Sequence, residues 1–166
     1  IFLIIFNKRE VFIFNGVRIR YIFIAIIAAV GFVFLLPILG KVINHQFPTN
    51  IYNLKFSFEK LKTPYGLDLI LLTPIVEELF FRNYIQKGLT KNYKPITAII
   101  LSALLFSMIH IQFPALFLEY IDFSLNNAYF TFFGGLISGI LYFKSKSIYP
   151  SILFHMIWNF MIIITR

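Results

Sequence analysis

The residues best suited to chemistry are two adjacent glutamates and an arginine inside an apolar run. Glu78 and Arg82 are four residues apart, so on a helix they share one face and can form an ion pair. Glu77 points about 100° away from that face and lacks the same partner. A carboxylate without a neighbouring cation can take a proton from water, as a general base does. We therefore predict a supporting role for Glu78 and Arg82 and a catalytic role for Glu77, although all three could form a purely structural ion cluster.

Two histidines and an asparagine extend this set. His110 stands four residues after Phe106, and taken alone it could equally be a hydrogen-bonded core histidine. His155 and Asn159 are also four residues apart, so an imidazole and a carboxamide can converge on one oxygen atom. Such a pair can also bridge neighbouring helices. Because ionisable groups in apolar segments are costly and usually have a task, the combination predicts one functional site.

The composition indicates what surrounds these residues. The chain has 166 residues, of which 59% are hydrophobic and only 13% are charged. Average globular proteins carry roughly 25% charged residues. The apolar residues also form long runs, which are typical of helices that cross a bilayer. We therefore predict an all-α fold, a polytopic transmembrane helical bundle of about five to six spans surrounded by membrane lipids.

The expected spans cover residues 21–43, 66–89, 96–112, 128–143 and 150–166, and residues 1–6 resemble the end of another span. Pro95 suits the first turn of a helix, and residues 115–127 suit a loop, a re-entrant piece or a half-helix. Close helix packing is expected at three glycines, Gly134, Gly135 and Gly139. Residues 1–66 are predicted to form the N-terminal span or spans and a connecting segment, and residues 67–166 the catalytic helical core. The chain opens at Ile1 inside an apolar run, so we expect it to be part of a longer protein.

The net charge of +8 comes largely from short loops between the expected spans. This alternation follows the positive-inside rule, with the acidic segment around Glu119 and Asp122 facing outward. We therefore expect no nucleic-acid partner. The absence of cysteine excludes disulfides, thiolate metal sites and a cysteine nucleophile. Heavy use of Ile, Phe, Asn and Lys favours a bacterial source, and hence an integral protein of the bacterial cytoplasmic membrane.

The three polar motifs together resemble those of the CPBP family, which includes CAAX proteases, bacteriocin-processing enzymes and abortive-infection (Abi) membrane proteins. The family pattern is E-E-x-x-x-R on one span, F-x-x-x-H on the next, and H-x-x-x-N on a later one. This sequence carries all three in that order, at Glu77-Glu78-x-x-x-Arg82, Phe106-x-x-x-His110 and His155-x-x-x-Asn159. The resemblance covers roughly residues 67–165.

The resemblance implies an intramembrane endopeptidase that cleaves membrane-associated or hydrophobic peptides. Glu77 would activate a water molecule with the help of His110, while His155 and Asn159 would stabilise the tetrahedral oxyanion. No cofactor is favoured. Zinc is the alternative, because Glu77, His110 and His155 could supply three ligands and leave one position open. One glutamate cannot easily be both a ligand and the base, so we prefer a metal-free mechanism.

Two other functions fit the same residues less well. The fold could serve as a non-proteolytic scaffold that regulates a membrane protein partner, with a structural polar cluster. This alternative is weakened because no residue of the three motifs is missing. A transporter with a carboxylate proton relay is disfavoured, since the chain has no internal repeat.

Overall fold

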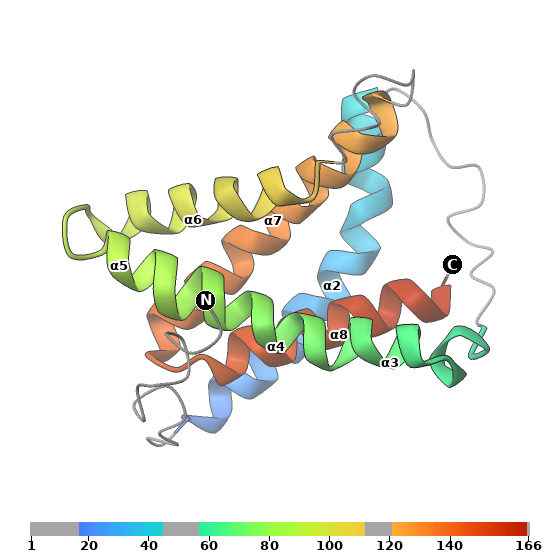
Figure 1. The fold of residues 1–166 in the computed structure, drawn as a ribbon, viewed down its shortest axis with the longest axis horizontal. Helices are drawn as coiled ribbons and strands as arrows, with labels where there is room; N and C mark the ends of the chain where they lie inside the picture. The colour runs from blue at the N-terminus through green and yellow to red at the C-terminus, as the bar shows by residue number, and fades with distance from the viewer. Residues whose placement is uncertain (1–16, 45–56, 112–120, 166) are drawn as a thin grey trace.

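The part of the chain that the structure describes is entirely helical, which confirms the predicted all-α class (Figure 1). This structure is a computed structural model, and it describes residues 17–44, 57–111 and 121–165. The elements are α2 (Ile19–Asn44), η2 (Lys60–Lys62), α3 (Pro64–Ile70), α4 (Leu72–Glu78), η3 (Leu79–Gln86), α5 (Lys87–Leu89), α6 (Pro95–Ile109), α7 (Ile121–Ser145) and α8 (Tyr149–Thr165). The predictions for residues 1–6 and for the segment around Glu119 lie outside the described residues.

Several helix bounds differ from the sequence-based ones. The helices α2 and α8 begin and end within two residues of the predicted spans 21–43 and 150–166. Pro95 occupies the first turn of α6, as predicted, but α6 ends at Ile109 rather than at residue 112. The helix α7 begins at Ile121, so the predicted start at residue 128 is wrong. Residues 121–127 contain Asp, Ser and Asn, which favour turns in isolation but are helical here.

The predicted helix over residues 66–89 is divided into four consecutive pieces. Pro74 has no N–H, so it cannot bond to the carbonyl of Ile70, and Leu71 separates α3 from α4 with φ −105° and ψ −62°. After Glu78 the chain continues as the π-helix η3 before one short α-helical stretch, α5. A π-helix is rare and is found mostly at functional sites.

Close packing of small and aromatic residues holds the helices together. The helix α6 packs on α7, and α2 packs on α8 (Figure 1). A Cβ atom added at Gly135 would lie 3.3 Å from the backbone of Ala103 on α6, and one at Gly134 would overlap the ring of Trp158 on α8. The prediction of close helix approach at these glycines is therefore confirmed. The main core joins α2, η3, α6, α7 and α8 through their buried side chains, including Phe32, Phe81, Phe106, Phe154 and Trp158.

The prediction of five to six membrane spans is not confirmed by these helices. Within the described ranges, none of the helices combines the length and the apolar composition that crossing a bilayer requires.

Candidate active site

The two adjacent glutamates lie at the end of α4, and their side chains diverge. The Glu78 side chain is 1% exposed, whereas the Glu77 side chain is 20% exposed. This difference follows from the angle between consecutive residues on a helix, as the sequence predicted. One carboxylate is therefore enclosed by the protein, and the other can meet a molecule in the adjoining cavity.

Glu78 binds groups from three other positions in the bundle. Its Oε2 accepts a hydrogen bond from Arg82 Nε at 2.9 Å and a short one from Ser138 Oγ on α7. Its Oε1 lies 3.1 Å from Nδ1 of His155 on α8. The predicted Glu78–Arg82 ion pair is thus present, and both of its members are buried. Such a pair stabilises only when further hydrogen bonds satisfy it, which Ser138 and His155 provide here.

Arg82 extends the same network toward α6. Its Nη1 donates to Ser102 Oγ at 3.1 Å, and that hydroxyl donates to the backbone carbonyl of Phe81 at 2.9 Å. The guanidinium carbon lies 5.6 Å from the ring centre of Phe106, within the range of a cation–π contact. These contacts hold α6, which carries His110, against the helix of the glutamates.

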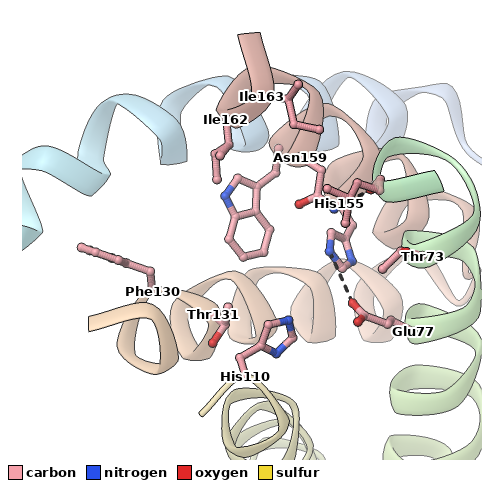
Figure 2. A pocket seen from close by; sticks show the side chains of 11 residues that line it. Thr73, Glu77, His110, Phe130, Thr131, His155, Asn159, Ile162 and Ile163 are labelled. Carbon is pink, nitrogen blue, oxygen red and sulfur yellow. Dashed lines mark hydrogen bonds and ion pairs between the residues drawn. The ribbon is translucent and has the colours of Figure 1, made fainter. Parts of the chain in front are cut away.

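Glu77 faces a cavity of about 280 Å³ together with the other predicted catalytic residues (Figure 2). Glu77, His110, His155 and Asn159 all line it, although they come from three separate segments of the chain. Oε2 of Glu77 lies 3.7 Å from Nε2 of His155 and has no hydrogen-bond partner among the described residues. The two ring nitrogens of His155 therefore face two different carboxylates.

His110 is oriented by its own helix. It caps the C-terminal end of α6, and its Nδ1 lies 2.8 Å from the carbonyl oxygen of Phe106. Because a carbonyl only accepts, Nδ1 carries the hydrogen in this contact, and Nε2 is the nitrogen that can accept a proton in the neutral ring. The ring also packs against Phe106, with 4.6 Å between centroids.

Asn159 is fixed where the helix of the glutamates is interrupted. Its Nδ2 donates to the carbonyl oxygen of Leu69 at 2.8 Å, so it ties α8 to the end of α3. A carboxamide has two N–H groups, and this bond uses one of them. The same side chain also lines the cavity.

The cavity has a polar wall and an apolar wall. The polar wall adds two hydroxyl residues, Thr73 and Thr131, to the four predicted catalytic residues. The apolar wall is formed by Leu69, Phe130, Trp158, Ile162 and Ile163. Charged and neutral polar groups can therefore act on a peptide bond while apolar side chains exclude bulk water, a combination that strengthens electrostatic interactions.

The three potential zinc ligands, Glu77, His110 and His155, all line the cavity. Among the described residues, no group of three His, Cys, Asp or Glu side chains has positions that could hold a metal ion. This includes the proposed set of Glu77, His110 and His155.

Four buried polar residues around the glutamates were missed by the sequence analysis. Ser102 and Ser138 bond to Arg82 and Glu78, while Ser151 Oγ donates to the carbonyl of Ser138 at 2.8 Å. Gln86 Nε2 donates to the carbonyl oxygen of Gly139 at 3.0 Å. Spacing contained a signal for three of them, since Ser102, Gln86 and Ser151 each lie four residues from Phe106, Arg82 and His155, respectively.

Comparison with protein families identifies a family to which this chain is similar. The model of a family described as Type II CAAX prenyl endopeptidase Rce1-like matches residues 60–161. The matched range contains the two glutamates, Arg82, both cavity histidines and Asn159. No curated protein and no solved structure matches the chain significantly.

Proposed function

Because the chain belongs to the Type II CAAX prenyl endopeptidase Rce1-like family, we propose that it is an intramembrane endopeptidase that hydrolyses peptide bonds of membrane-associated substrates. One observation carries this proposal. Glu77, His110, His155 and Asn159 line the same cavity, although up to 82 residues separate them along the chain (159 − 77). A base and several hydrogen-bond donors around one cavity are the groups that peptide hydrolysis requires.

In the proposed reaction, Glu77 takes a proton from a water molecule while the water oxygen attacks the carbonyl carbon of the peptide. The carbonyl oxygen becomes a tetrahedral oxyanion. An N–H at Nε2 of His155 donates to this oxyanion, and the second N–H of Asn159 adds another donor. The proton held by Glu77 then passes to the leaving nitrogen as the C–N bond breaks.

His110 has a separate part in this scheme. Its Nδ1 is engaged by the carbonyl of Phe106, and we assign the orienting of the attacking water to Nε2. Glu78 and Arg82 do not touch the substrate; they hold His155 and the helices in place. We propose that the reaction needs no metal, since the carboxylate of Glu77 is required as the base and a zinc ligand would lose that freedom.

A membrane setting is supported by the apolar side chains that remain on the outside. On α2 the exposed residues include Ile19, Phe23, Ile27, Phe34 and Leu35, and Ile27 is 71% exposed. On α6 they include Ile96, Leu104, Leu105, Met108 and Ile109. Many large apolar side chains exposed on the same helices indicate contact with lipid or with a partner rather than with water. Substrates would then be peptides that reach the same layer, including peptides with a lipidated C-terminus.

The proposal is tested with the full chain purified in detergent and a set of membrane-anchored peptide reporters, one of them prenylated near its C-terminus. We expect the wild type to cleave at least one reporter and Glu77→Gln to reduce that rate by a factor of about 10² to 10⁴. Glu59→Gln is the matched control, because Glu59 is exposed and lies outside the cavity. Cleavage should persist in the presence of a chelator.

The other outcomes distinguish the alternatives. Loss of cleavage with chelator, restored by zinc, would keep the peptidase but overturn the metal-free mechanism. Full activity of Glu77→Gln on a reporter that the wild type cleaves would overturn the assignment of the base. If the Glu77→Gln variant kept the full cellular function of the wild type, the protein would instead be a scaffold for a membrane partner.

A further inference from the structure

Seven exposed basic side chains gather in one half of the molecule. They come from three places that are distant in sequence: the start of α2, the stretch from α5 to the turn before α6, and the stretch from the end of α7 to the turn before α8. All three lie in the same half of the molecule along its long axis, the half that ends at the turn between α5 and α6 (Figure 1). The residues are Arg18, Arg20, Lys87, Lys91, Lys94, Lys144 and Lys146, and each is exposed. We refer to this set as the basic end.

No described acidic side chain belongs to the basic end. Glu59 and Asp68 lie on η2's flank and on α3, at the opposite end of the long axis (Figure 1). Glu77 and Glu78 are directed to the cavity and to the interior network. The seven cations therefore have no described carboxylate beside them, and their combined field is available to an external anion.

Exposed apolar side chains adjoin the same cations along the chain. Ile19 and Phe23 follow Arg18 on α2, Tyr93 and Ile96 flank Lys94, and Phe143 precedes Lys144. Their exposed fractions range from 40% for Phe143 to 70% for Ile19. Cations that neighbour aromatic and aliphatic groups suit the boundary between lipid headgroups and acyl chains, where aromatic side chains are enriched.

We propose that the basic end binds anionic phospholipid headgroups. The apolar neighbours favour a lipid over a nucleic acid. The acyl chains of a lipid would cover these apolar side chains, whereas a nucleic acid bound to the cations would leave them exposed to water. This inference depends on the membrane setting of the proposed function but not on its chemistry. Lys87 is ten residues after Glu77, so the reactive carboxylate would lie at most roughly 15 Å from the headgroup level, about half the thickness of the hydrocarbon layer.

The test measures binding of fluorescent phosphatidylglycerol and phosphatidylcholine to the full chain in neutral detergent. The variant Lys91→Gln/Lys144→Gln removes two cations of the basic end, one after α5 and one at the end of α7. Lys60→Gln/Lys62→Gln is its matched control, because it removes two exposed lysines at the opposite end. We expect wild type to prefer phosphatidylglycerol and the first variant to bind it on the order of 25-fold more weakly, with less than a twofold change in the control.

Three results would overturn the proposal. One is equal affinity of the wild type for both lipids, and another is an equal loss of affinity in the two double variants. The third is displacement of phosphatidylglycerol by inorganic phosphate or a short RNA at equal concentration, which would identify a general anion or nucleic-acid surface. Glu77→Gln should bind phosphatidylglycerol as the wild type does. The lipid-binding result therefore does not depend on whether the peptidase assay succeeds. Thermal unfolding of each variant verifies that it is folded.

Discussion

Nδ1 of His155 lies 3.1 Å from Oε1 of Glu78, and this contact joins α8 to the helix of the paired glutamates. The other ring nitrogen, Nε2, lies 3.7 Å from Oε2 of Glu77. Two consecutive residues thus contact the two sides of one imidazole. Glu78, which is enclosed and also bonded to Arg82 and Ser138, fixes the ring, while Glu77 shares the cavity with it.

Removing the charge of Glu78 should destabilise the protein strongly. Glu78→Gln leaves the Arg82 guanidinium buried without its ion-pair partner, and breaking such a pair from one side costs about 3–5 kcal/mol of unfolding free energy. Replacing both members, as Glu78→Gln/Arg82→Met, should recover most of that loss, because no unpaired charge remains. Thermal or denaturant unfolding of the detergent-solubilised protein measures both values.

The control for this pair is Glu59→Gln, which removes a carboxylate from an exposed position. It should change the unfolding free energy by about 0.5 kcal/mol or less. A Glu78→Gln variant as stable as this control would show that the buried pair is not needed for the fold.

A methyl group at Gly139 should also destabilise the bundle. A Cβ atom there would lie 2.8 Å from Oε1 of Gln86 and 3.1 Å from the side chain of Ile99. Gln86 would have to move, and its hydrogen bond to the Gly139 carbonyl would be strained. Gly139→Ala should therefore lower the unfolding free energy by about 1–3 kcal/mol, the usual cost of overpacking.

Gly31→Ala is the control for Gly139→Ala, because it should not destabilise the protein. Gly31 is inside α2, and an added Cβ would meet nothing within 4 Å. Alanine is the better helix former by about 1 kcal/mol, so this variant should be as stable as the wild type or more stable. Equal unfolding temperatures for the two glycine variants would contradict the close approach of α7 to η3.

The helical elements could be predicted because they depend on local patterns. Apolar runs gave α2 and α8 to within two residues, and Pro95 marked the start of α6. The interruption at Leu71 was missed, although Pro74 lies inside the predicted helix over residues 66–89 and removes one of its backbone hydrogen bonds. The π-helix after Glu78 has no sequence signal of comparable strength, since it depends on how the whole segment packs.

The ion pair beside the candidate site could be predicted because its two members repeat at helical spacing. Glu78 and Arg82 are four residues apart, and their ion pair follows from that spacing. The contact between Glu78 and His155 spans 77 residues, so it depends on the packing of α8 against α4. The hydrogen bond from Ser138 to Glu78 could not be predicted either. A serine beside small residues is more typical of close helix packing than of a bond to a carboxylate.

The substitution His110→Asn distinguishes the role of Nδ1 from the role of Nε2 in this histidine. The Asn carboxamide can occupy the place of Nδ1 and still donate to the Phe106 carbonyl, as Nδ1 does at 2.8 Å, but it offers nothing at the place of Nε2. If Nε2 orients the attacking water, cleavage should fall by a factor of about 10² to 10⁴ while the unfolding temperature stays near that of the wild type. The measurement pairs a reporter cleavage rate with a thermal melt.

His110→Gln serves as the comparison, because its longer carboxamide reaches toward the position of Nε2 but gives up the bond that Nδ1 makes to Phe106. This variant should be less stable by about 1 kcal/mol, the net worth of one hydrogen bond, and should retain more cleavage than His110→Asn if orienting the water is the main task. A His110→Asn protein that cleaves at the wild-type rate would instead make His110 a helix-capping residue without a part in the reaction.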